Sequence, residues 1–182
     1  MQVVRAKTHR RTLQDTTGLT LIEILIVVLL LGIIATIMID QMSTSTAEVR
    51  LNMLKTNLGN LRGAVRHYYF QHNATYPGSH SHLDGTPIAS DAEAEAAFLS
   101  QLIHYSAADG RTAVSGSSAY PYGPYIKGAV LPPNPFNHKS NIACDYDESD
   151  ITQRDSSGSD AGWKFYPRTG VLIAADGAHD TD

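Results

Sequence analysis

The sequence has a single cysteine, Cys144, among its 182 residues. A lone cysteine excludes an internal disulfide, a CxxC motif and a thiolate metal cluster. The sequence also lacks GxSxG, HExxH, P-loop and dinucleotide-binding motifs, so it gives no support to the enzyme classes that use them. We therefore expect a protein that is not an enzyme and that requires no cofactor.

Basic side chains are scarce outside the first 18 residues. Those 18 residues contain four basic side chains and one acidic one, a net charge of +3, which leaves 10 basic and 17 acidic side chains in the remainder, a net charge of −7. An acidic chain without basic clusters is a poor nucleic-acid binder, so no nucleic acid is expected as a partner. The positive-inside rule predicts that the basic start stays cytoplasmic and that the acidic remainder is exported.

Long apolar runs are absent from the sequence with one exception, residues 19–39. These 21 residues would span about 31 Å as a helix, which matches the hydrocarbon core of a bilayer. The run predicts a single transmembrane segment that also serves as a polymerisation helix. A cleaved secretory signal peptide and a plain signal anchor are the alternatives, but neither explains an ionisable residue, Glu23, one turn inside the run.

Cleavage of the chain between Gly18 and Leu19 would give Glu23 a role in assembly. The new α-amino group would then begin the helix, with Glu23 as the fifth residue. In a bundle of packed helices, this carboxylate and the amine of a neighbouring subunit could neutralise each other and set the axial register.

The stretch 18–23, Gly-Leu-Thr-Leu-Ile-Glu, resembles the class III signal of type IV pilins and of type II secretion pseudopilins. It has Leu19 where the family usually has Phe. The resemblance implies that residues 1–18 are a leader peptide, which prepilin peptidase removes after Gly18, and that the same enzyme methylates the new N-terminus at Leu19. It further implies that Glu23 acts in subunit recruitment and assembly.

Residues 40–71 continue the helix in amphipathic form. Apolar residues recur there at alternating spacings of three and four, which places them on one helical face: Leu51, Leu54, Leu58, Leu61, Val65 and Tyr68. Gly59 and Gly63 reduce helix propensity, and close approach of a strand is the expected reason for them.

Residues 72–182 are expected to form a globular domain. Ser90 with Glu93 forms a capping box that opens a helix ending near Tyr105. Two strand-like runs within 162–176 flank the turn 167–170 and predict a C-terminal hairpin. The predicted fold class is α+β: a long N-terminal α-helix, transmembrane in its first half and amphipathic in its second, packed on a small C-terminal antiparallel β-sheet in the manner of pilins.

Three segments of the second half are similar to the G-type major pseudopilins: Gly-Pro-Tyr-Ile-Lys at 123–127, Leu-Pro-Pro-Asn-Pro-Phe at 131–136 and Gly-Trp-Lys-Phe-Tyr at 162–166. The similarity implies a structural subunit of a secretion pseudopilus. It would lie in the bacterial inner membrane as a single-pass protein, with the N-terminus cytoplasmic and the C-terminal domain periplasmic, and would assemble into a periplasm-spanning filament.

The partners implied by this similarity are other copies of the chain, other pseudopilins, prepilin peptidase and the inner-membrane assembly platform. A type IV pilin or minor pilin of a surface filament for adhesion, motility or DNA uptake is the alternative. A membrane-anchored exported protein of another function is a second alternative.

The G-type resemblance also implies a calcium site in the C-terminal loops. Ca²⁺ takes six to eight oxygen ligands, and the candidate residues are acidic: Asp145, Asp147, Glu148, Asp150 and Asp176. Their spacing matches no EF-hand, and a solvated acidic loop is the alternative. His80 and His82 could similarly bind a transition metal or simply be surface histidines.

Overall fold

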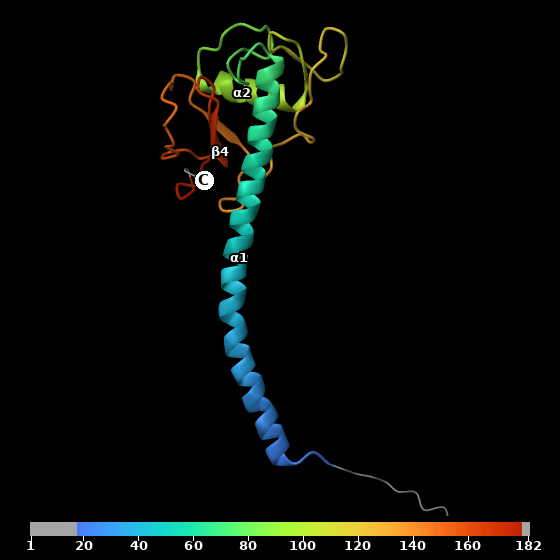
Figure 1. The fold of residues 1–182 in the computed structure, drawn as a ribbon, viewed down its shortest axis with the longest axis vertical. Helices are drawn as coiled ribbons and strands as arrows, with labels where there is room; N and C mark the ends of the chain where they lie inside the picture. The colour runs from blue at the N-terminus through green and yellow to red at the C-terminus, as the bar shows by residue number, and fades with distance from the viewer. Residues whose placement is uncertain (1–17, 180–182) are drawn as a thin grey trace, which may run out of the picture. The chain divides into compact units, whose positions relative to one another are not determined.

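The structure, a computed structural model, describes residues 18–179, and for residues 37–45 it describes the helical backbone alone. Residues 1–17 of the predicted leader peptide lie outside the described residues. The chain divides into two compact units, Met1–Ser45 and Thr46–Asp182. One helix, α1 (Leu21–Gln71), contributes to both units (Figure 1).

Helix α1 begins two residues later than the predicted start because Thr20 is its N-cap. The Thr20 hydroxyl accepts a hydrogen bond from the backbone N–H of Glu23 at 3.3 Å. In return, the Glu23 carboxylate accepts hydrogen bonds from the Thr20 N–H at 3.0 Å and from its hydroxyl at 2.9 Å. This reciprocal pattern is a capping box, which satisfies donors that a helix start leaves without partners.

The prediction of a transmembrane half, and of a single-pass location in the inner membrane, is corrected by the structure. Among the described residues, no helix combines enough length with enough apolarity to cross a membrane.

The second half of α1 packs against the globular unit through the predicted apolar face. Five of its six predicted residues are at most 3% exposed, which confirms the inference from their spacing: Leu54, Leu58, Leu61, Val65 and Tyr68. The sixth, Leu51, is only partly buried.

The explanation predicted for the two glycines of α1 is wrong. A Cβ atom added to Gly59 or to Gly63 would meet nothing within 4 Å. No strand therefore approaches the helix closely at these positions.

The helix α2 (Asp91–Ile103) begins as predicted, with Ser90 as the N-cap whose side chain accepts from the Glu93 N–H. It ends before the predicted Tyr105, because that residue opens the short strand β1 (Tyr105–Ser106), which pairs antiparallel with β2 (Thr112–Ala113). The inward face of α2 is fully buried, and it consists of Ala94, Ala97, Phe98 and Leu102.

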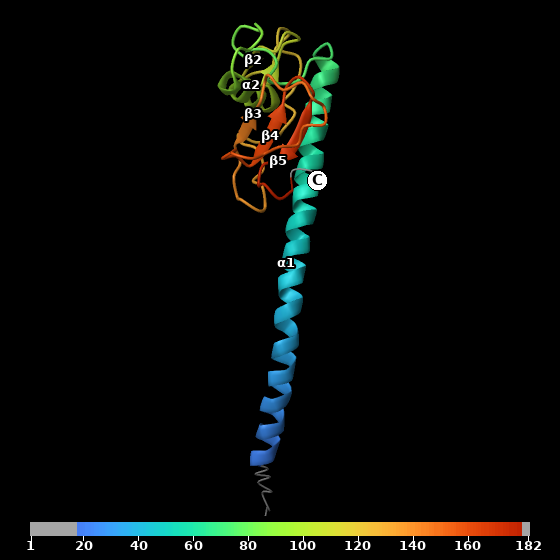
Figure 2. The same cartoon turned by 90° about the vertical axis from the view of Figure 1, so that its left-hand side faces the viewer.

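The main sheet has three strands in the order β3–β4–β5: β3 (Ile142–Cys144), β4 (Trp163–Tyr166) and β5 (Val171–Ala174). Strands β4 and β5 form an antiparallel hairpin, with Phe165 opposite Leu172. Figure 2 shows β5 beside the second half of α1.

The sheet is mixed, which corrects the predicted antiparallel sheet. Strand β3 runs parallel to β4, with Ala143 opposite Lys164. A parallel pair needs a long crossover connection, and here residues 145–162 supply it. The acidic, polar composition of that connection hides the three-residue strand that precedes it.

The core of the second unit lies between α1, α2 and this sheet. Trp163 and Phe165 are fully buried at its centre. The Trp163 Nε1–H donates to the Pro132 carbonyl at 2.8 Å, and the ring of Phe98 lies 4.6 Å from that of Phe165. The sheet domain is therefore anchored on both helices.

Candidate functional site

Gly18 and Leu19, which flank the predicted cleavage point, are exposed just before α1. Glu23 lies one turn inside α1, where hydrogen bonds from the Thr20 backbone and then from its side chain lower the Glu23 pKa. The carboxylate is thus held in its ionised form at neutral pH. Thr20 was missed as a functional residue, although the spacing Thr-x-x-Glu is the sequence signature of a capping box.

The remaining surface of this helical segment is apolar and uncovered. Every Leu, Ile and Val side chain between positions 19 and 34 is at least 49% exposed. A contiguous apolar surface of this kind marks a site of interaction with other molecules.

The five predicted calcium ligands are not brought together. No group of three or more His, Cys, Asp or Glu residues in the described chain could hold a metal ion. Each carboxylate instead has partners within the protein. Asp147 pairs with Arg168 at 3.0 Å, and Asp150 accepts from the Thr152 N–H at 2.8 Å.

Asp145 and Glu148 are bound to their own loop. Asp145 accepts from the Glu148 N–H at 3.2 Å, and Glu148 accepts from the Asp150 N–H at 2.7 Å. Such contacts between neighbours rigidify an acidic loop. The calcium site stays a prediction that these contacts do not support.

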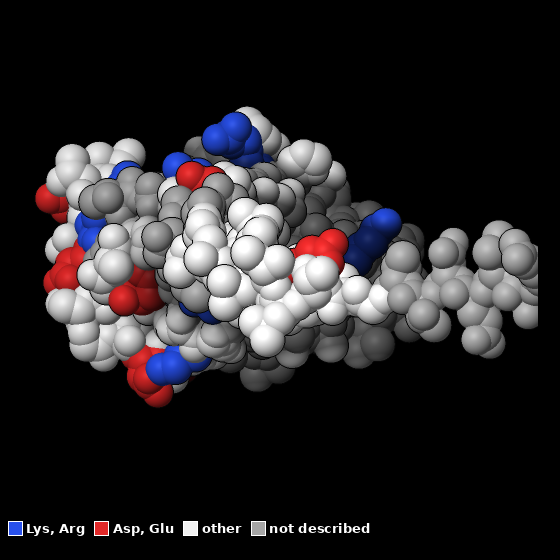
Figure 3. Space-filling view, turned by 90° about the horizontal axis from the view of Figure 1, so that it is seen from below, with Lys and Arg blue, Asp and Glu red and all other residues white. Residues whose placement is uncertain are grey.

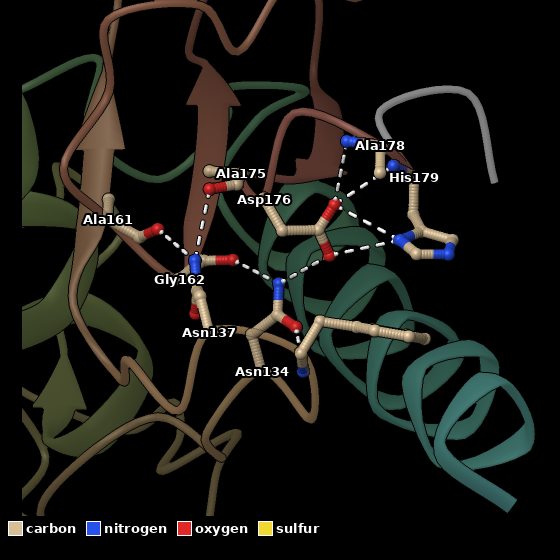
Figure 4. Close-up of polar contacts among 9 residues, drawn as sticks. Asn134, Asn137, Ala161, Gly162, Ala175, Asp176, Ala178 and His179 are labelled. Carbon is tan, nitrogen blue, oxygen red and sulfur yellow. Dashed lines mark hydrogen bonds and ion pairs between the residues drawn. The ribbon is translucent and has the colours of Figure 1, made fainter. Parts of the chain in front are cut away.

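Asp176 lies apart from the acidic loop, at the end of β5 (Figure 4). Its carboxylate accepts from the backbone N–H groups of Ala178 and His179 at 3.0 and 2.9 Å, and from the buried Asn134 Nδ2 at 3.3 Å. Burial acts to raise the Asp176 pKa, but these hydrogen bonds outweigh it and lower the pKa. Asp176 is therefore an ionised structural tie between the C-terminal segment and the loop of Asn134.

Asn137 makes a second tie in the same region, with its Nδ2 donating to the carbonyls of Ala161 at 2.8 Å and Ala175 at 3.1 Å (Figure 4). The Asn-Pro-Phe-Asn stretch at 134–137 thus joins the loop to both β4 and β5. Hydrogen bonds within the protein therefore give Asn134 and Asn137 a structural role.

Cys144 is buried, and its thiol pKa is raised well above its usual range, first by burial and then by nearby carboxylates, with Glu95 the foremost. The thiol stays protonated and unreactive. The same neighbourhood joins α2 to β3. The backbone N–H groups of Cys144 and Tyr146 donate to the carboxylates of Glu95 at 3.2 Å and Asp91 at 2.9 Å.

His80 and His82 take part in backbone contacts. The His80 carbonyl accepts from the side chain of Gln101 at 2.9 Å, and the His82 carbonyl accepts from the Thr112 N–H at 3.0 Å. The two carbonyls hold the loop against α2 and β2.

An open cavity of about 540 Å³ lies between α1 and the start of β5. Three arginines and three aromatic residues contribute to its lining: Arg62, Arg66, Arg154, Tyr69, Phe70 and Tyr76. The sequence does not predict this cavity. The spacing of Arg62, Arg66 and Tyr69 puts them on one helical face, but nothing in the sequence indicates that Arg154 joins them.

Comparison of the chain with protein-family models, with curated proteins and with solved structures finds no match.

Proposed function

We propose that the chain is a structural subunit of a type II secretion pseudopilus. It is cleaved after Gly18, methylated at Leu19 and assembled through the part of α1 in the first unit. The observation that supports this most is the sequence Gly-Leu-Thr-Leu-Ile-Glu at 18–23, followed directly by an apolar helix whose large side chains are uncovered.

Association of several copies would cover that apolar surface. Full burial of one Leu, Ile or Val side chain stabilises by about 1.5–3 kcal/mol relative to exposure. Contacts among several such side chains therefore offset the roughly 4–15 kcal/mol that association costs in lost translational and rotational freedom. The apolar surface is large enough to serve as the polymerisation surface.

Glu23 supplies specificity to this otherwise apolar contact. Its carboxylate is held by hydrogen bonds from Thr20, and in the proposed bundle it would face the α-amino group of Leu19 in a neighbouring subunit. An ion pair inside a packed bundle favours one axial register over others even where it adds little stability. The partners are other copies, other pseudopilins, prepilin peptidase and the assembly platform.

A surface type IV pilus is the competing assignment within the same family. Major pilins often close a C-terminal loop with a disulfide, whereas this sequence has a single cysteine, which is buried. This difference favours the secretion pseudopilus.

Intact-mass and N-terminal analysis of the protein purified from its native host tests the processing step. The expected product begins at N-methylated Leu19. A chain that retains Met1, or that begins near Glu48, would overturn the proposal.

Co-assembly of Glu23 variants with tagged wild-type subunits tests the assembly role. Glu23→Ala removes both the charge and the cap, whereas Glu23→Gln keeps a hydrogen-bond acceptor for the cap and removes only the charge. We expect both variants to lose recovery with the wild-type subunit, and the exposed control Glu48→Gln to retain it. Normal recovery of Glu23→Gln would show that the cap, not the charge, matters and would refute the register role.

A further inference from the structure

We propose that the cavity between α1 and β5 binds an acidic peptide segment of another protein, in which carboxylates flank an apolar or aromatic side chain. The cavity lies entirely within the second unit, so this inference does not depend on the assembly proposed for the first.

The charge of the cavity is opposite to that of the unit that contains it. Residues 46–182 contain 10 basic and 15 acidic side chains, yet among the described residues three arginines and no carboxylate line this cavity. On the face of the molecule drawn in Figure 3, by contrast, side chains of both signs lie interspersed. A lining of one sign attracts and orients a ligand of the other sign.

Two of these guanidinium groups are held in place before any ligand arrives. Arg62 donates from Nε and Nη2 to the Leu172 carbonyl at 3.1 and 2.9 Å. Arg154 donates from Nη1 to the carbonyls of Ile151 and Gln153 at 2.9 and 2.8 Å. Because arginine presents several donors in a planar fork, Arg154 can address a carboxylate with its remaining N–H groups. Pre-positioning reduces the entropy that binding costs.

The aromatic wall is also preorganised. Tyr69 packs on Tyr76 with ring centroids 4.4 Å apart, and Phe70 packs edge-on against Tyr69 at 5.8 Å. Phe70 remains 74% exposed. Gly170, whose φ is +73°, lets Tyr76 lie against the chain at the turn before β5, because a Cβ atom there would overlap the Tyr76 ring.

The polar groups of the lining select the class of ligand. In the part of the chain that the structure describes, no Asp, Glu, Asn or Gln side chain lines the cavity, so a neutral sugar would lack the carboxylate and amide acceptors that hydroxyl groups need. Val65, Val171 and Leu172 add an apolar surface next to the aromatic rings. A lining of arginines and apolar side chains suits a ligand that carries carboxylates on either side of an apolar group. The volume of the cavity lies within the range of roughly 300–1,000 Å³ that is typical of ligand sites.

Fluorescence anisotropy tests the proposal with the full-length chain, kept in solution by a non-ionic detergent that covers the exposed apolar helix. The probe is a fluorescein-labelled peptide DDFLDD, compared with NNFLNN and DDGSDD. We expect DDFLDD to bind at least about tenfold more tightly than either of the other two, because each of those lacks one of the two recognised features. Raising the salt concentration from 50 to 500 mM should weaken its binding several-fold.

Matched variants assign the binding to the cavity. The double variant Arg66→Glu/Arg154→Glu should weaken DDFLDD at least about tenfold, and Phe70→Ser should do so while leaving the salt dependence intact. The control Arg50→Glu/Lys127→Glu makes the same change of net charge at exposed positions outside the cavity and should bind as the wild type does. Circular dichroism of each variant checks that the fold is retained.

Several results would overturn the proposal. These are no binding of DDFLDD at 1 mM, equal binding by the cavity double variant, or tighter binding of a sulfated polysaccharide that the peptide does not displace. Self-association that only the cavity variants abolish in sedimentation experiments would instead assign the cavity to a second copy. None of these results changes the expectation that the mature chain begins at Leu19. The binding proposal and the assembly proposal can therefore be refuted independently.

Discussion

The two halves of α1 have similar aliphatic side chains but opposite exposure. Leu25, in the first unit, is 61% exposed, whereas Leu58, in the second unit, is 1% exposed. Between Leu21 and Ile34 the helix is apolar on all sides except at Glu23, whereas the second half restricts its buried apolar residues to one face. A helix that is apolar on all sides can pack against several neighbouring molecules. A helix with one apolar face packs against a single domain.

The two halves of α1 therefore have the same backbone conformation and differ in whether their side chains pack against the rest of the protein. In the second half, tertiary contacts with α2 and the sheet supply the stabilisation that helix propensity alone does not. In the first half, the described side chains make local hydrogen bonds: those of the cap formed by Thr20 and Glu23, and one from the Thr36 hydroxyl to the Ile33 carbonyl at 2.7 Å. The assembly proposed above would add intermolecular contacts to this half.

The largest expected effect comes from truncating one leucine in each half. Leu58→Ala should lower the free energy of unfolding of the second unit by about 2–5 kcal/mol, because it leaves a cavity in the core. Leu25→Ala should change it by less than about 0.5 kcal/mol. Urea denaturation followed by the fluorescence of the buried Trp163 measures both, and equal losses would remove the distinction between the halves.

Two glycines of the second unit should respond to alanine with opposite signs. A Cβ atom at Gly162 would overlap the Lys139 carbonyl, so Gly162→Ala should destabilise by about 1–3 kcal/mol through forced displacement of the backbone. Gly59→Ala meets nothing within 4 Å on the exposed side of α1 and should stabilise by about 0.5–1 kcal/mol through helix propensity. Chemical denaturation of the two variants side by side decides this, and a loss at Gly59 would show that the helix needs that glycine for contact.

The smallest expected effect is a loss of stability in mild acid through His72, at the end of the buried half of α1. Its Nδ1 faces the Tyr68 carbonyl at 2.9 Å and must donate, so its Nε2, 3.0 Å from the Ser106 hydroxyl, accepts. Burial lowers the His72 pKa, although hydrogen bonds to Tyr68 and Ala107 and the charge of Asp109 oppose the shift. The unfolded chain therefore binds the proton more readily than the folded one.

The contribution of His72 is fully present above the unfolded pKa of about 6.5 and is lost as the pH falls toward the lower folded pKa. Urea midpoints measured from pH 7.5 to pH 5 should decrease in that window. His72→Asn should flatten the decrease, and His67→Asn, at an exposed position, should leave it unchanged. A midpoint that rises on acidification would contradict the neutral, buried imidazole.

The elements predicted from local patterns agree with the structure where the pattern has a single physical cause. The alternating spacing from Leu54 to Tyr68 reflects burial of one helical face, and the pair Ser90 and Glu93 marks a helix start. The failures concern partners distant in sequence. Strand β3 has only three residues, and its parallel pairing with β4 depends on the whole 145–162 connection.

The candidate sites divide in the same way. The motif at 18–23 is contiguous, so the sequence alone gives its residues, including a capping box that was present but not recognised. The calcium prediction joined Asp176 to an acidic loop that the fold keeps separate from it. The arginine cavity depends on bringing Arg154 to the face of α1 that carries Arg62, and spacing cannot indicate such a contact.

Asp91 and Glu95 accept hydrogen bonds from the backbone of the β3 segment. These bonds also affect how readily copies of the protein aggregate at high concentration. A strand edge with free N–H groups is a template for pairing with another chain, the first step toward aggregation. Here the N–H groups of Cys144 and Tyr146 are occupied by negative charge, and on the opposite strand β5 the Leu172 carbonyl is occupied by Arg62. The sheet thus resists edge-to-edge pairing between copies, which would leave the helix to make the ordered contacts of the assembly proposed above.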